Sequence, residues 1–270
     1  MLDLVGMRLL SAQIGLAVVA IILAVTIGAS AQVIVTNSMV TYGYQEAPAN
    51  TFTPPSPLIS ESPYSELSFA STGLVANSST AFPNPITGGQ VSTLSGILTV
   101  DMTATPGMWF SGTNALALDV AGSYSMSAPF GSSEAFTSIS ASYTVYLQEV
   151  DGVAFSSSTT LNGQLSIMPT NVFTLSGPGT VASGLWNGSL SLDINAIKAH
   201  FGIASTNNVT GMRLQYSTVL TAAGRGDGTA YVDTLNFTVT NQVVPEPSTY
   251  ALLLLAVAFL GIAARRRRVS

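Results

Sequence analysis

Several stretches of the chain place apolar side chains at every second position, the period of a β-strand that is buried on one face. Residues 116–120, 212–220 and 231–240 show this alternation most clearly. In the last stretch the odd-numbered positions carry the large apolar side chains, so the pattern puts Asp233 on the same face as Phe237 and Val239. Alternation of this kind predicts half-buried antiparallel strands, and here it also predicts a carboxylate on a buried face. The alternative is that the face is reversed near the start of the strand, which would leave Asp233 at an exposed rim.

Turn residues between these runs favour antiparallel pairing. Asp151-Gly152 separates two runs that contain apolar residues, and this dipeptide prefers the positive φ angles of a type I′ hairpin. Asn162-Gly163 indicates a second turn on the same grounds. We therefore predict hairpins at both places.

One segment departs from the period of two. Ile194, Ile197 and Phe201 recur at helical spacing. Asp193, just before them, has the side chain of an N-cap, and Gly202, just after them, is a typical C-terminal stop. We predict one short helix between these two residues.

The pattern as a whole indicates a mainly β fold. No internal repeat is present, which argues against a solenoid or propeller, and the alternating runs favour an antiparallel β-sandwich, with a jelly-roll as one form of it. We place this ectodomain at residues 67–241. Residues 45–63 hold five prolines and few large apolar side chains, so residues 32–66 are predicted to form an extended arm rich in Pro, Ser and Thr.

The C-terminus has three parts. Pro245, Glu246 and Pro247 come first, and because each proline removes a backbone donor and biases its neighbour toward extended geometry, an exposed extended strip is predicted there. An uncharged apolar run of 15 residues follows at 250–264, a short transmembrane helix at about 1.5 Å per residue. A basic stop ends it: Arg265, Arg266, Arg267 and Arg268. By the positive-inside rule the ectodomain lies outside the cytoplasm.

Together with Ser248 and Thr249, these parts resemble the PEP-CTERM sorting signal of exopolysaccharide-producing Gram-negative bacteria. The resemblance is confined to residues 244–270, and we place the whole sorting segment at 242–270. It implies that an exosortase, a membrane-embedded cysteine peptidase, recognises Pro245-Glu246-Pro247 and removes the basic-tailed helix. The rest of the protein would then pass to the cell surface or extracellular matrix. The alternative is an ordinary single-pass anchor.

The N-terminus has the features of a secretory signal peptide. Residues 14–27 are apolar and uncharged, and Ala29-Ser30-Ala31 supplies the small-x-small pattern at which signal peptidase cleaves. We predict that residues 1–31 are removed after Ala31 during secretion and that the mature chain begins at Gln32. A retained N-terminal anchor is the alternative.

The segment between the two signals is acidic and sparsely charged. Residues 32–244 carry 11 acids and 3 bases, so the formal charge is 3 − 11, or −8, compared with −5 for the whole chain. Nucleic-acid binding needs clustered Lys and Arg, and we exclude it on this ground. The chain has no cysteine, which excludes disulfides and thiol catalysis.

The sequence offers few groups for catalysis. His200 is the only histidine of the chain, and it lies at the end of the predicted helix. No Gly-x-Ser-x-Gly nucleophile elbow occurs. Glu149 and Asp151 flank the predicted hairpin, and they would serve a glycosidase only if the fold held two acids across a cleft. We predict that the protein is not an enzyme, and a secreted hydrolase is the least favoured alternative.

No cofactor is predicted. Calcium is a candidate, since it binds oxygen ligands and a secreted sandwich can supply them from separate segments. The candidate ligands are Asp193, Asp227 and Asp233. Neither an EF-hand nor a nonapeptide spacing accompanies them.

These features predict an exported, exosortase-processed surface or matrix protein, structural or adhesive and associated with exopolysaccharide or biofilm. The alternative is a carbohydrate-binding module that retains exopolysaccharide, in which aromatic rings stack on sugars. The aromatic candidates lie in Gly- or Ser-rich surroundings: Trp109, Trp186, Tyr42, Tyr44 and Tyr124. The expected partners are exosortase, signal peptidase, the secretion machinery, exopolysaccharide and, before processing, the membrane.

Overall fold

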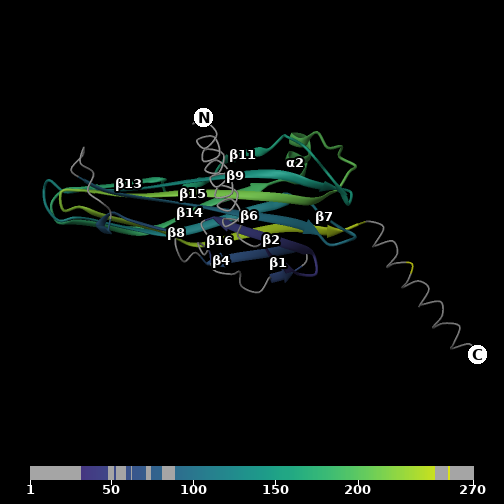
Figure 1. Cartoon of the computed structure of the whole chain (residues 1–270), viewed down its shortest axis with the longest axis horizontal. Coiled ribbons are helices and arrows are strands. Elements are labelled where there is room, and N and C mark those ends of the chain that lie inside the picture. Colours follow the sequence, from purple (N-terminus) through teal and green to yellow (C-terminus); the bar gives the residue numbers. More distant parts are fainter. Residues whose placement is uncertain are drawn as a thin grey trace, which may run out of the picture. The chain divides into compact units, whose positions relative to one another are not determined.

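Two antiparallel β-sheets form the folded part of the chain (Figure 1). The structure is a computed structural model, and it describes residues 32–47, 52, 59–61, 63–70, 74–80, 89–246 and 255. The predicted signal peptide lies outside the described residues, as does the predicted transmembrane helix apart from Leu255. Within the described part of the chain, no helix combines the length and apolarity that a membrane span needs.

Strands make up nearly all of the regular structure in the described residues. In chain order they are β1 (Val33–Thr36), β2 (Val40–Ala47), β3 (Ile59–Glu61), β4 (Tyr64–Ala70), β5 (Val75–Asn77), β6 (Gly89–Ala104), β7 (Met108–Phe110), β8 (Leu116–Ala128), β9 (Glu134–Val150), β10 (Val153–Ala154), β11 (Leu161–Gln164), β12 (Ser166–Met168), β13 (Val172–Ser176), β14 (Thr180–Leu192), β15 (Val209–Arg225) and β16 (Thr229–Pro245). A 3-10 helix, η1 (Ser78–Thr80), and an α-helix, α2 (Ile194–Phe201), complete the described elements.

The first sheet is built around three long strands, β6, β15 and β9. Its order is β1-β2-β6-β15-β9-β10, and β11 and β13 pair with the same edge of β9 that β10 occupies. β15 pairs with β6 along one edge and with β9 along the other. The neighbouring strands are antiparallel, as the alternation predicted.

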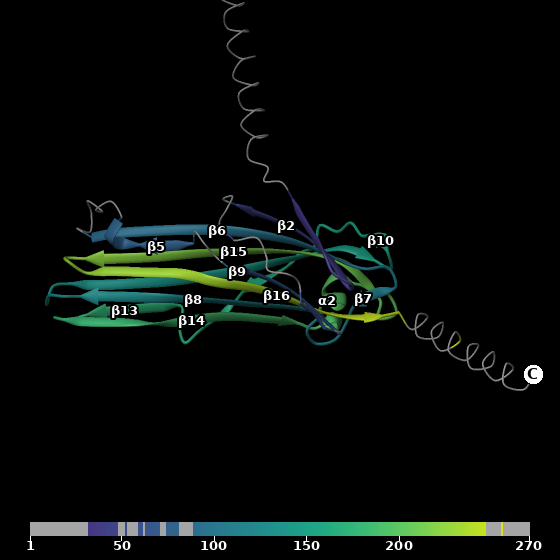
Figure 2. The ribbon, with the colours of Figure 1, turned by 90° about the horizontal axis from the view of Figure 1, so that it is seen from below.

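The second sheet is built around β16. Its order is β12-β14-β8-β16-β4-β3, and β5 and β7 also pair with β16. β6 and β15 belong to the first sheet and β8 and β14 to the second, and Figure 2 shows these long strands running lengthwise through the sandwich. The prediction of a mainly β, two-sheet fold is confirmed.

The apolar faces of the two sheets pack on one core. Tyr216 of β15 and Phe237 of β16 meet across it, with ring centroids 4.7 Å apart. Phe69 of β4, paired with Phe237 on the neighbouring strand, also packs against it, with the two ring centroids 6.0 Å apart. The largest fully buried side chains come from both sheets: Trp186, Tyr42, Tyr216, Phe69, Phe110 and Phe237. Apolar burial is therefore the main source of stability in this cysteine-free chain.

The predicted arm at residues 32–66 is wrong where the structure describes strands within it, namely β1, β2, β3 and the start of β4. Residues 33–36 and 40–47 form β1 and β2, and β2 pairs along β6. Tyr42 and Tyr44 of β2 are buried in the core. The prolines that suggested a loop begin only at Pro48, so the chain before them was free to form strands.

A β-bulge in β16 makes the predicted faces of this strand wrong. The register against β8 shifts between Thr234 and Asn236, which leaves Leu235 as an extra residue. Before the bulge the even-numbered residues face the core, and after it the odd-numbered residues do. Asp233, which was predicted to share a face with Phe237, therefore lies on the opposite face of the sheet, where it is still buried, at 8% exposure.

Two predictions that depended on local signals, the hairpin at Asp151-Gly152 and the short helix, are confirmed. Asp151 and Gly152 have φ angles of +50° and +74°, as a type I′ hairpin requires. Helix α2 begins after Asp193, whose side chain caps it, and ends at Gly202 in the left-handed conformation. Ile197 on its inner side is fully buried, so the helix packs its apolar face on the core.

Candidate functional site

The outer face of the first sheet carries a continuous row of hydrogen-bonding side chains, which we call the polar row. It crosses five strands through directly opposed residues: Gln45 on β2, Thr99 on β6, Gln215 on β15, Thr144 on β9 and Asn162 on β11. Gln45 and Asn162 are exposed at its two ends, and the other three are half-buried. Because neighbouring strands lie about 4.8 Å apart, the row spans roughly 19 Å.

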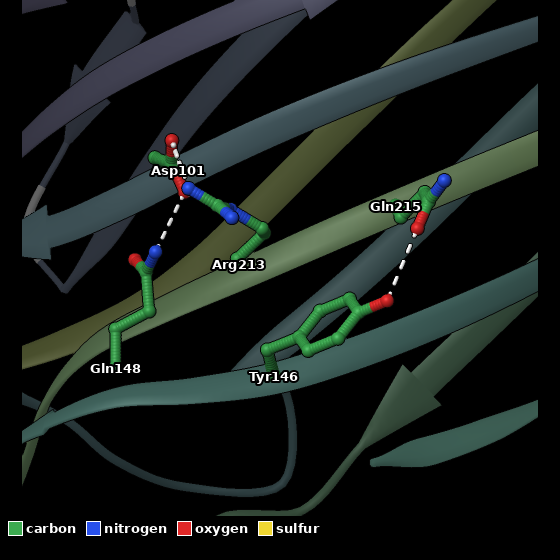
Figure 3. Close-up of polar contacts among 5 residues, drawn as sticks. All are labelled: Asp101, Tyr146, Gln148, Arg213 and Gln215. Carbon is green, nitrogen blue, oxygen red and sulfur yellow. Dashed lines mark hydrogen bonds and ion pairs between the residues drawn. The ribbon is translucent and has the colours of Figure 1, made fainter. Parts of the chain in front are cut away.

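A second set of polar side chains lies beside the polar row on the same face (Figure 3). Arg213 holds Asp101 at two points, with Nε donating to Oδ1 at 2.6 Å and Nη2 to Oδ2 at 3.2 Å. Gln148 Nε2 also donates to Asp101 Oδ1, at 2.9 Å. The Tyr146 hydroxyl donates to Gln215 Oε1 at 3.2 Å, which ties this set to the polar row.

The ion pair leaves this face without net charge. The Arg213 and Asp101 side chains are 44% and 21% exposed, and their two-point contact neutralises both charges. The hydrogen bond to Asp101 raises the pKa of Arg213 above its ordinary value, because it favours the charged form of the guanidinium. Amide, hydroxyl and guanidinium groups in this arrangement can donate to and accept from a ligand that is rich in hydroxyls.

Sequence reasoning missed the polar row. The alternation over residues 212–220 placed Gln215 on a polar face, but its partners come from strands far away in the chain. The turn predicted at Asn162-Gly163 is wrong, because both residues lie within β11. Gly163 instead leaves room for Tyr143, since a β-carbon there would lie 2.7 Å from the tyrosine hydroxyl oxygen.

Four of the five aromatic residues that were predicted to stack on sugars are buried or already covered, and the fifth, Trp109, is half-buried on β7. Three of them are buried in the core: Trp186, Tyr42 and Tyr44. Tyr124 stacks on Phe173, with ring centroids 3.9 Å apart, so its ring is already covered. The polar face does carry an aromatic side chain, Tyr146, which sequence reasoning passed over because its partner Gln215 lies on another strand.

Pro245 and Glu246, the first residues of the predicted sorting motif, are part of the fold. Residues 243–245 pair with β7, and the Glu246 N–H donates to the carbonyl oxygen of Gly107 at 2.8 Å. Both motif residues are half-buried, so the prediction of an exposed strip is wrong for them. The other predicted signal residues lie outside the described part of the chain: Pro247, Ser248, Thr249, Arg265, Arg266, Arg267, Arg268, Ala29 and Ala31.

A hollow of about 450 Å³ opens beside Glu246. Glu149 and Asp151 line it. The start of β15 donates a hydrogen bond to Glu149, and the loop before β15 donates one to Asp151. Thr210 Oγ1 donates to Glu149 Oε1 at 2.9 Å, and the Asn208 N–H donates to Asp151 Oδ1 at 2.8 Å. These contacts give both acids a structural role at the end of the β9–β10 hairpin.

The three calcium candidates lie apart. Asp193 caps α2, where its side chain accepts from a backbone N–H of the first turn at 2.6 Å. Asp233 accepts from the N–H and hydroxyl of Ser123 and from the Tyr231 hydroxyl, and Asp227 is exposed in the turn between β15 and β16. In the part of the chain that the structure describes, no three His, Asp or Glu side chains gather as a metal site requires.

The C-terminal segment matches a known sorting signal. Residues 243–268 match the family described as the PEP-CTERM protein-sorting motif, which confirms the resemblance inferred from the sequence. The match covers the last residues of β16 and continues into the predicted transmembrane helix and arginine tail. No curated protein matches the chain.

Likenesses to solved structures are weak. A carbohydrate-binding module specific for non-crystalline cellulose is 8% identical, over 75% of this chain and 86% of that one, with a TM-score of 0.23. A winged bean acidic lectin complexed with methyl-α-D-galactose is 10% identical, over 67% and 99%, with a TM-score of 0.23. A family 22 carbohydrate-binding module of Clostridium thermocellum Xyn10B is 14% identical, over 64% and 91%, with a TM-score of 0.19. These scores are too low to support an argument about fold or ligand.

Proposed function

We propose that the protein is exported, held in the inner membrane as a precursor, cut by an exosortase and passed to the cell surface or extracellular matrix. The match of residues 243–268 to the PEP-CTERM protein-sorting motif carries this proposal. The sandwich begins at Val33, directly after the predicted signal cleavage, and ends at the motif. In this proposal the mature protein is a structural or adhesive matrix component, associated with exopolysaccharide and without enzymatic activity.

The surroundings of the reactive side chains support a role without catalysis. His200 Nε2 lies 3.0 Å from the carbonyl oxygen of Thr160, so one ring nitrogen is engaged by the backbone. Glu149 and Asp151, the acids considered for a glycosidase, bind Thr210 and the Asn208 backbone. These contacts stabilise loops at the end of the sandwich, which is a structural use of the groups.

Glu246→Ala tests the sorting route. The change removes the carboxylate of the motif and keeps the backbone N–H that bonds to Gly107. In a host that has an exosortase, we expect the precursor-to-mature ratio to rise by about tenfold or more, the effect of losing one hydrogen-bonded charge. The ratio is read on a gel, with mass spectrometry to identify the arginine tail, and Asp227→Ala in the distant β15–β16 turn is the control. An unchanged ratio for Glu246→Ala would make the segment an ordinary membrane anchor.

The outer face of the first sheet favours a second role within the same matrix function, the binding of neutral polysaccharide. The polar row and the Tyr146 hydroxyl offer donors and acceptors that sugar hydroxyls can satisfy. These groups lie along a strip that crosses five strands of the sheet. Asp101 and Arg213 neutralise each other there. The net charge of −8 on residues 32–244 disfavours acidic polymers by repulsion.

Affinity electrophoresis of the processed protein tests this second role. We expect slower migration in native gels that contain a neutral polysaccharide than in gels without one, and no slowing in gels that contain an acidic polysaccharide. Equal migration in all three gels would contradict polysaccharide binding and would leave the sorting route untouched.

A further inference from the structure

The last strand of the sandwich runs without interruption into the sorting motif. β16 ends at Pro245, and its C-terminal residues pair with β7 in the register Val243↔Phe110, Val244↔Trp109 and Pro245↔Met108. Neighbouring loops add backbone hydrogen bonds to the same end: the Val243 N–H donates to the carbonyl oxygen of Pro63 at 2.8 Å. The motif therefore starts while the chain is still held in the fold.

A tight turn positions the acceptor for the next motif residue. Residues 105–108 form a turn in which the Met108 N–H donates to the carbonyl oxygen of Thr105 at 3.0 Å. Pro106 and Gly107 occupy its centre, and Gly107 has a φ of +81°, the combination typical of a type II turn. The turn leads into β7 and presents the Gly107 carbonyl oxygen to the Glu246 N–H.

This arrangement restricts access to the first half of the motif. A peptidase binds its substrate as an extended segment through backbone groups and side chains. Here the Glu246 N–H is already bonded to Gly107, Pro245 is paired with Met108, and both motif residues are half-buried. The enzyme and the fold thus compete for the same two residues.

We propose that β7 and the turn at residues 105–108 form an internal docking site for the start of the sorting motif, and that the exosortase binds the motif only after this end of β16 detaches. The inference rests on the proposed exosortase processing. Strand ends open locally at a small fraction of the cost of global unfolding. The rate of processing is then the rate for a free motif multiplied by the fraction of chains in which the end is open.

Gly107→Ala tests the docking site. A side chain at a φ of +81° strains the turn, so the open fraction and the rate of precursor conversion should rise by about fivefold. Gly179→Ala is the matched control, because Gly179 has a φ of +71° in a turn at the opposite end of the second sheet. The measurement is pulse–chase conversion of the full-length chain in a host with its exosortase, and the control should convert at the wild-type rate.

A second variant keeps the test decisive if Gly107→Ala disturbs folding. Inserting Gly-Ser-Gly-Ser between Val244 and Pro245 leaves residues 32–244 unchanged and moves the motif away from β7. We expect this insertion to speed conversion as well. Wild-type rates for both variants would overturn the inference, and so would slower conversion of the insertion variant, because the enzyme would then read the docked form.

Glu246→Ala in the same host distinguishes a failure of the proposed exosortase route from a failure of the docking site. If that variant is converted normally, the exosortase route itself fails. If it blocks conversion while Gly107→Ala and the insertion leave the rate unchanged, only the docking inference fails.

Discussion

Hydrogen bonds between polar side chains inside the core connect the two sheets. The Tyr42 hydroxyl of β2 lies 2.7 Å from Ser65 Oγ of β4 and donates to Asn241 Oδ1 of β16 at 3.1 Å. Asn241 Nδ2 donates to the carbonyl oxygen of Ala115 at 2.9 Å, and Asn37 Nδ2 donates to Ser65 Oγ at 2.7 Å. Because buried polar groups are costly without partners, this network favours one relative placement of the strands that supply it.

Burial of two tyrosines predicts loss of stability at alkaline pH. Desolvation raises the pKa of Tyr42 and of Tyr216 well above the ordinary value of 10.0. The folded state therefore keeps both protons above pH 10 while the unfolded state releases them, so stability is fully present below pH 10 and falls above it. Each tyrosine contributes a loss of about 1.4 kcal/mol per pH unit until its folded pKa is reached.

Tyr42→Phe isolates one of these contributions. At pH 7 we expect the variant to be less stable by about 1–3 kcal/mol, because the polar groups of Ser65 and Asn241 lose a partner. Above pH 10 the difference from the wild type should shrink, since the variant has one proton fewer to release on unfolding. Urea unfolding from pH 7 to pH 11.5 measures both effects, and a difference that stays constant with pH would contradict the assignment to Tyr42.

At the scale of the element, the bulge in β16 decides which side chains enter the core. The carbonyl oxygen of Asp233, close to the extra residue Leu235, accepts from Trp186 Nε1 at 3.0 Å. Gly122 on β8 makes this contact possible, because a β-carbon there would collide with the Asp233 carbonyl and the Trp186 ring. The bulge allows both Val232 and Phe237, five positions apart, to face inward.

Two single-residue deletions in β16 should destabilise the protein to very different extents. Deleting Leu235 restores a regular ladder and keeps every inward residue inward, so the cost should be about 1–2 kcal/mol, mainly from the contact of Trp186 with Asp233. Deleting Thr238 turns buried Val239 and the residues after it outward, which should cost more than about 4 kcal/mol and prevent folding. Thermal unfolding followed by circular dichroism compares them. Equal destabilisation by the two deletions would show that the bulge does not set the inward face.

These elements also show what the sequence could predict. Helix α2 and the Asp151-Gly152 hairpin were predicted correctly because their signals lie within a few residues of each other. The bulge and the polar row were not predicted from the sequence, because both depend on the register between strands that are distant in the chain. The arm was misjudged for a similar reason: the strand character of residues 40–47 depends on pairing with β6.

At the scale of the whole molecule, the two outer faces of the sandwich differ in chemistry. The first sheet presents the polar row, with the paired charges of Asp101 and Arg213 beside it. The second sheet presents Val181 and Leu185 on β14, which are 75% and 72% exposed. A matrix protein with this construction would meet hydrated polysaccharide with its first sheet, since that face combines the polar row with a neutralised ion pair.

Gln215→Ala should therefore weaken binding of neutral polysaccharide. Gln215 is the middle residue of the polar row and accepts from the Tyr146 hydroxyl, so its replacement removes the side-chain amide and leaves that hydroxyl without this acceptor. We expect about tenfold weaker binding, measured as the slowing of migration in native gels over a series of polysaccharide concentrations. Thr221→Ala is the matched control, because Thr221 lies on the same face of β15, three alternate positions further along. It should bind like the wild type, and both variants should unfold within a few degrees of it. Binding that is unchanged in Gln215→Ala, or weakened equally in Thr221→Ala, would rule out the polar row as the binding site.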